Sequence, residues 1–109
     1  MTEEQLDLLR MVINRADSAA QDLDHRIEIL EEGSDSVKIQ LVDDDDRTVS
    51  TVAWVRYLGP YQLVDYEEVE EGEVVDNELF GVRVEGASAM PRWRIIDARG
   101  INLLAMLYV

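Results

Sequence analysis

A strict heptad repeat runs through the first third of the chain and constrains its fold more than any other feature. Apolar residues recur from Leu6 onward at gaps that alternate between three and four residues. A repeat of this kind keeps one apolar seam of a helix facing a partner helix along a left-handed supercoil. The a and d positions of the repeat are Leu6, Leu9, Ile13, Ala16, Ala20, Leu23, Ile27 and Leu30. We therefore expect one long helix that forms a parallel coiled coil.

Both ends of this helix carry sequence signals. Thr2 followed by Glu3, Glu4 and Gln5 has the pattern of a capping box, in which the Thr2 hydroxyl and the Gln5 side chain satisfy backbone N–H groups. Gly33 supplies a stop, because glycine readily takes the left-handed conformation that closes a helix. We expect a coiled-coil helix over residues 1–33 and a second domain over residues 34–109.

The charges beside the seam indicate how many chains assemble. Arg26 falls at a g position and Glu31 at the following e position, which face each other between neighbouring chains of a parallel coiled coil. The segment Arg26–Glu31 resembles a trimerisation motif of short parallel coiled coils. Isoleucine at a with leucine at d favours two strands instead. We expect a homotrimer in preference to a dimer, and a monomeric helix packed on its own sheet is the third possibility.

Composition limits the classes of function. The chain has 109 residues, no cysteine, and 24 acidic against 10 basic residues, giving a net charge of −14. Such a charge disfavours nucleic acid and anionic membranes as partners. The apolar runs are shorter than the roughly 18 residues of a membrane span, and the acidic start lacks the basic region of a signal peptide. We therefore expect neither a nucleic-acid nor a membrane partner.

The sequence after Gly33 changes from a helical to a strand period. Apolar and polar residues alternate in the first of the expected strands, which is typical of a half-buried strand. The expected strands cover residues 37–41, 48–58, 61–66, 79–85 and 93–97, and the first two form a hairpin. The run Ile101–Val109 is apolar almost throughout and is compatible with a buried strand or a buried helix; its length after Gly100 slightly favours a strand. The expected fold is α+β, with the N-terminal helix followed by a small antiparallel β-sandwich or barrel.

Two stretches resemble sites of chemistry. Asp43–Asp46 could collect oxygen ligands for calcium, but it lacks the spacing of a calcium loop and is interpreted as a solvated turn. Gly86–Met90 begins like a nucleophile elbow, but Met90 stands where the last glycine is needed. The sole histidine, His25, is expected on the outer face of the helix, so no base accompanies Ser88. We predict a protein without catalytic activity, cofactor or metal ion.

Three other features are candidate binding surfaces. Leu8 and Met11 lie outside the heptad seam and either pack on the β-domain or form a docking patch. The aromatic residues could include a platform for sugar rings, although core or interface positions are the commoner use of such residues in strands. An acidic stretch without a base could imitate a row of DNA phosphates, or could simply guard an exposed edge against aggregation. Its acids are Asp65, Glu67, Glu68, Glu70, Glu71, Glu73, Asp76 and Glu78.

The layout of the chain resembles small structural proteins of tailed bacteriophages of the fibre, baseplate or head-decoration type. The segment Ala19–Glu31 is similar to the stalks of such fibres, and the order of helix and β-domain agrees. The resemblance implies a homotrimeric structural or attachment protein of the virion, which binds other virion proteins and gains avidity from identical copies. The alternative is an acidic phage-encoded inhibitor that mimics nucleic acid and blocks a defence protein in the host cytoplasm.

Overall fold

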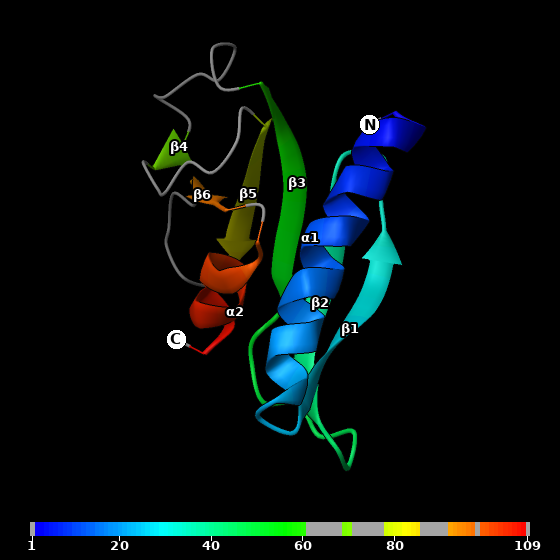
Figure 1. Ribbon diagram of the computed structural model, residues 1–109, viewed down its shortest axis with the longest axis vertical. Coiled ribbons are helices and arrows are strands. Elements are labelled where there is room, and N and C mark those ends of the chain that lie inside the picture. Colours follow the sequence, from blue (N-terminus) through cyan, green and yellow to red (C-terminus); the bar gives the residue numbers. More distant parts are fainter. Residues whose placement is uncertain (1, 61–68, 71–77, 86–91, 98, 109) are drawn as a thin grey trace.

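The computed structural model describes residues 2–60, 69–70, 78–85, 92–97 and 99–108. Two helices and six strands make up this part of the chain (Figure 1). Their bounds are α1 Glu3–Gln21, β1 His25–Glu32, β2 Val37–Asp43, β3 Ala53–Pro60, β4 Val69–Glu70, β5 Glu78–Val84, β6 Trp93–Ile96 and α2 Ile101–Leu107.

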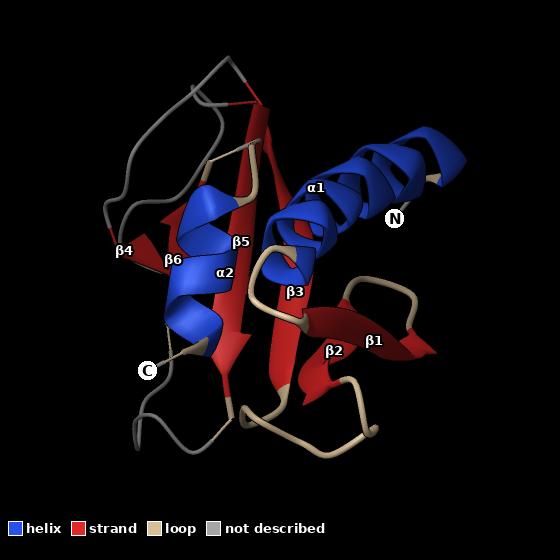
Figure 2. Cartoon of the chain, turned by 60° about the horizontal axis from the view of Figure 1, so that its bottom comes forward, coloured by secondary structure: helices blue, strands red, loops and turns tan. Residues whose placement is uncertain are grey.

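The strands form one sheet in the order β1-β2-β3-β5-β6-β4. The first five strands of this order pair antiparallel, and the short β4 runs parallel to β6 at the far edge. Helices α1 and α2 lie over the same face of the sheet (Figure 2). They contact each other, and apolar residues of both belong to the same buried cluster as residues of β2, β3, β5 and β6. The fold is therefore α+β, with a helical layer on one face of a single sheet, and not a β-sandwich or barrel.

Helix α1 ends at Gln21, which corrects the expected helix over residues 1–33. Asp22 is the C-cap, and Asp24 takes a left-handed conformation with φ of 60°. Aspartate is a poor helix former, and negative charge at a helix C-terminus opposes the helix dipole. From His25 onward the chain is strand β1, because Ile27 and Ile29 also alternate with polar residues at the strand period of two. The part of the heptad repeat after Gln21 is therefore compatible with both a helical and a strand period, and it forms a strand from His25 onward.

The helical part of the heptad seam is buried within its own chain. Leu9, Ile13, Ala16 and Ala20 are at most 1% exposed, together with Val12 beside them. They pack against the sheet, so this apolar stripe faces the core of the same molecule. The expected arrangements were a trimeric coiled coil, a dimeric coiled coil and a helix packed on its own sheet. In the structure, α1 packs on the sheet of its own chain. The seam is not free to form a coiled coil.

The C-terminal apolar run is helix α2, which corrects the expected strand. Leu103 and Leu107 are four residues apart and lie on one helical face, where both are buried against the core. Asp97 helps to begin the helix, because its carboxylate accepts a hydrogen bond of 3.3 Å from the backbone N–H of Ile101. Gly100 precedes the helix with a φ of 81° and lies against the backbone of α1.

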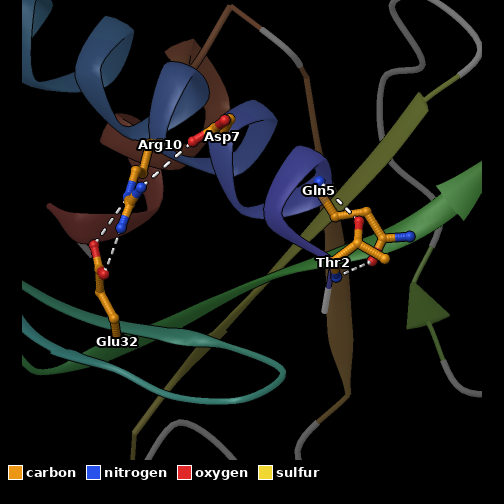
Figure 3. A network of polar contacts seen from close by, with 5 residues as sticks. All are labelled: Thr2, Gln5, Asp7, Arg10 and Glu32. Carbon is orange, nitrogen blue, oxygen red and sulfur yellow. Dashed lines mark hydrogen bonds and ion pairs between the residues drawn. The ribbon is translucent and has the colours of Figure 1, made fainter.

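Four of the expected strands correspond to β2, β3, β5 and β6, and the hairpin of β2 and β3 is confirmed in its antiparallel pairing. The expected strand over residues 61–66 lies outside the described residues. The capping box is also confirmed, since Thr2 and Gln5 exchange side-chain to backbone hydrogen bonds of 3.0 and 3.2 Å (Figure 3).

Strand β1 forms one edge of the sheet, and two features protect it. The carboxylate of Asp17 on α1 accepts a hydrogen bond of 2.7 Å from the backbone N–H of Ile27. A bulge at Leu30 interrupts the ladder between Ile29 and Glu31. Occupied donors and bulges both hinder the addition of another strand to an edge. Further strand pairing at β1 is therefore disfavoured.

Candidate functional site

The sheet face opposite the helices gathers aromatic and cationic side chains from four strands. Residues of β2 alternate, so that Val37, Ile39 and Leu41 are buried towards the helices while Lys38 points to the other face. The pairing register aligns Lys38 with Trp54 and Trp54 with Arg83. We call the set Lys38, Trp54, Arg56, Arg83 and Trp93 the cation–aromatic face.

Each cation of this face lies over an indole ring. The Nζ atom of Lys38 is 5.3 Å from the ring centroid of Trp54. The guanidinium carbons of Arg56 and Arg83 are 5.3 and 5.0 Å from the ring centroid of Trp93. A cation held over an aromatic ring at an exposed site contributes about 0.5–1 kcal/mol. All five side chains are half-buried, so these contacts order a surface that solvent still reaches.

Gly81 makes room for this arrangement in the middle of β5. A Cβ atom at Gly81 would lie 3.0 Å from Cδ1 of Leu58 and 3.2 Å from Cβ of Trp93. Trp93 and Leu58 also pack with the buried Leu79 and Ile95 in a second, smaller apolar cluster. A glycine inside a strand commonly marks such a close approach. The absence of a side chain at Gly81 therefore lets Trp93 lie close to the sheet.

In the described part of the chain, no acidic group forms a close ion pair with the cations of this face. Among the described residues, no ion pair involves Lys38, Arg56 or Arg83. The Nε atom of Arg56 is buried and has no hydrogen-bond acceptor there. Glu31 of β1 is aligned with Lys38 by the pairing register and is exposed. The face therefore runs from an acidic edge at β1 to a cationic centre at β3 and β5.

The structure separates the charged pair that the heptad predicted. Arg26 and Glu31 both lie on β1, and Arg26 forms an ion pair with Asp46 of the same chain. The last two heptad leucines are on the surface, since Leu23 is 56% and Leu30 is 42% exposed, whereas Ile27 packs against the core. These residues do not form one seam. No geometry in the described chain brings them together as an oligomerisation site.

The two residues of the predicted docking patch differ in environment. Leu8 packs against the main core, while Met11 is 37% exposed. Leu6, at the start of the heptad, is also partly buried against the core. Leu8 therefore packs on the β-domain, which was one of the two expected roles of this pair. Met11 is exposed and does not form a patch together with Leu8.

Most of the acidic stretch Asp65–Glu78 lies outside the described residues. Glu70 belongs to strand β4, and Glu78 begins β5. The hydroxyl of Tyr57 donates a hydrogen bond to the Glu78 carboxylate. Burial, followed by this bond, raises the pKa of Tyr57 to about 12. Glu78 thus has a structural partner.

The remaining sequence candidates have structural contacts or cannot be placed. One carboxylate oxygen of Asp43 accepts hydrogen bonds of 2.9 Å from the backbone N–H groups of Asp45 and Arg47, which orders the turn after β2. Within the described ranges, no group of three or more His, Cys, Asp or Glu side chains is positioned to hold a metal ion. His25 Nδ1 lies 2.6 Å from the Tyr108 hydroxyl at the end of α2. Gly86–Met90 lies outside the described residues.

A further polar network connects α1 to the end of β1. The guanidinium of Arg10 donates hydrogen bonds of 3.0 and 2.7 Å to the two carboxylate oxygens of Glu32 and also reaches Asp7 at 3.4 Å (Figure 3). The bond to Arg10 lowers the pKa of Glu32, and the bond to Glu32 raises the pKa of Arg10. Such an exposed pair orients the two elements and has a small effect on stability.

Sequence reasoning did not find the cation–aromatic face. Its members are spread over more than fifty residues, and only the strand register makes them neighbours. The available signal was the alternation of buried and cationic or aromatic residues in Val37–Leu41 and Ala53–Tyr57. That alternation identifies a second face, but it does not say which residues meet across strands.

Comparisons with protein-family models, with curated proteins and with solved structures find no match to this chain. In the part of the chain that the structure describes, neither helix has the length and apolar character that a membrane crossing requires. The geometry of the cation–aromatic face is therefore the basis for a functional proposal.

Proposed function

We propose that the protein is a non-catalytic structural or attachment protein that works as an assembly of identical copies. The observation that supports this proposal is the cation–aromatic face, on which Trp54 and three cations that form no ion pair with a described residue are half-buried opposite the helical layer. Tryptophan and arginine are the residue types most enriched where proteins bind each other tightly. The proposed occupant of the face is a second copy of the chain.

Charge complementarity favours a second copy as the occupant. The chain carries a net charge of −14, yet this face presents Lys38, Arg56 and Arg83 without acidic partners in the described region. Another copy of the same chain offers exposed carboxylates, including Glu31 at the edge of the same sheet. Contacts of a few ångströms act within the Debye length of about 8 Å, whereas repulsion between distant charges is largely screened at physiological salt.

The narrower form of the proposal is a virion component of a tailed bacteriophage, such as a fibre, baseplate or head-decoration protein. The acidic composition and the order of an N-terminal helix followed by a β-sheet support this form. Such particles are built from repeated copies, so a face that binds an identical chain serves their assembly. The rival function is an acidic inhibitor that imitates nucleic acid, which the eight acids of Asp65–Glu78 support.

Light scattering at increasing protein concentration tests the proposal. Self-association predicts that the mass rises from 12.5 kDa towards a multiple of that value at physiological salt. A mass of 12.5 kDa at every concentration up to the millimolar range would contradict it. The inhibitor hypothesis predicts such a monomer, together with competition against duplex DNA for a basic DNA-binding protein that disappears as salt is raised.

A further inference from the structure

We propose that the helix-free face is self-complementary and pairs two copies face to face about a two-fold axis that runs parallel to the strands, between β2 and β3. This inference rests on the proposed function and specifies the interface. The resulting assembly has four layers, with two sheets inside and the helices of each copy outside.

The strand order determines which strands such an axis superposes. In the order β1-β2-β3-β5, rotation about a line between β2 and β3 places β1 of one copy over β5 of the other and β2 over β3. Glu31, Lys38, Trp54 and Arg83 lie in one row across these four strands, because the register pairs each with the next. The rotation therefore sets Glu31 of each copy opposite Arg83 of the other.

The charges in this row fit the rotated copy. Glu31 is exposed at the acidic edge, and Arg83 has no ion pair among the described residues. The two-fold operation creates this contact twice, with the apolar planes of the two Trp54 rings near the centre. Glu31 of each copy can thus form an ion pair with Arg83 of the other copy without any change in the fold of either chain.

The size of the face sets the expected affinity. The axis superposes four strands about 4.8 Å apart, roughly 19 Å across. From the shared row, β1 and β2 continue in one direction and β3 and β5 in the other, so the superposed length is less than the roughly 23 Å of a seven-residue strand. Two such faces therefore bury less than about 900 Å² in total, which is the size of a weak, transient interface. Weak dimerisation, with a dissociation constant of about 100 μM or more, is therefore expected, and the mass should be measured between about 10 μM and 1 mM.

Reversing the charge of Glu31 or of Arg83 tests the pairing. The salt dependence of dimerisation would be a poorer test, because salt weakens both the attraction between these residues and the repulsion between two acidic chains. Glu31→Lys places cation against cation at both contacts of a homodimer, and Arg83→Glu places acid against acid. Each variant alone should weaken dimerisation roughly ten-fold or more. An equimolar mixture should recover the dimer, because both contacts of the mixed pair are again of opposite sign.

Matched controls separate this effect from net charge and from misfolding. Asp44→Lys and Arg47→Glu change the charge by the same amounts in the exposed turn after β2, and both should dimerise like the parent chain. The double variant E31K/R83E should dimerise as the mixture does. Its recovery would also show that neither single substitution prevents folding, which circular dichroism melting checks directly.

Each outcome decides between the inference and the function that it rests on. A parent chain that reaches about 25 kDa, twice the 12.5 kDa chain, with loss in each single variant and recovery on mixing, supports the two-fold pairing. Oligomers that ignore both substitutions, or a mass near 37.5 kDa for three chains, would overturn the pairing and leave self-association standing. A persistent monomer would overturn both.

Discussion

Gly100→Ala is the substitution for which the structure predicts the clearest loss of stability. Gly100 precedes α2 and fits closely against α1, where a Cβ atom would lie 2.7 Å from the Val12 carbonyl oxygen and 2.8 Å from the Ala16 backbone nitrogen. Both contacts are with main-chain atoms of a helix whose side chains at these positions are fully buried. Neither atom can rotate away, so α2 or the end of β6 must move.

The magnitude has two parts. Gly100 has a φ of 81°, and a residue with a Cβ atom in a left-handed conformation costs about 1–2 kcal/mol. Overpacking a buried contact between helices costs about a further 1–3 kcal/mol. We therefore expect Gly100→Ala to lower the free energy of unfolding by about 2–5 kcal/mol. In urea, with a slope of about 1–3 kcal/mol per molar, the midpoint should fall by roughly 1 M or more with little change in slope.

Gly59→Ala is the matched control. Gly59 also has a positive φ, of 117°, but a Cβ atom there would have no neighbour within 4 Å. This variant should show the backbone cost alone, about 1–3 kcal/mol, and the excess loss at Gly100 measures the helix contact. Adding Ala16→Gly to Gly100→Ala should not restore stability, because the two closest contacts are with backbone atoms. A loss at Gly100 no larger than that at Gly59 would refute the proposed packing of α2 on α1.

Two further predictions concern a tyrosine and the sheet edge. The pKa of Tyr57 rises from 10.0 in a free side chain to about 12 in the folded chain, so its contribution to stability is complete below pH 10 and is lost as the pH rises through 12. Alkaline unfolding of Tyr57→Phe should therefore lack part of the pH dependence seen in the parent chain between these values, and identical curves would contradict the assignment. Asp17→Ala should lower the free energy of unfolding by about 1–3 kcal/mol, because the N–H of Ile27 loses a charged acceptor at 2.7 Å. Asp17→Asn keeps an oxygen acceptor and should lose clearly less in the same urea titration; equal losses would argue against the bond.

The heptad illustrates how a correct pattern can lead to an incorrect structure. Its residues from Leu6 to Ala20 do lie on one helical face, as the period requires. The same period continued through Ile27 and Leu30, where Ile27 and Ile29 also alternate at the strand period. Pairing with β2 gives residues 25–32 backbone partners and packs the partly buried Ile27 against the core, which an isolated helical extension could not do. The sequence of this segment is equally compatible with a helical and a strand period, and its tertiary contacts therefore determine that it is a strand.

The interpretation of the C-terminal run failed for a related reason. Ile101–Val109 has no alternation, so apolar character alone could not distinguish a strand from a helix. The burial of Leu103 and Leu107 follows a helical spacing that becomes visible only when α1 is present as the surface on which they pack. The cation–aromatic face was missed because Lys38, Arg83 and Trp93 are distant in sequence and meet only through the strand register.

Features that depend on near neighbours along the chain could be predicted from the amino-acid sequence. These are the capping box that begins α1, the apolar stripe of that helix, the alternating strands with their first hairpin, and the strongly acidic balance. Three features depend on tertiary contacts: the end of α1, the packing of its apolar stripe on its own sheet, and the set of charged and aromatic residues that share the helix-free face. The physical reason is range: capping and periodicity act over a few residues, whereas burial and strand register depend on segments that are far apart in the sequence.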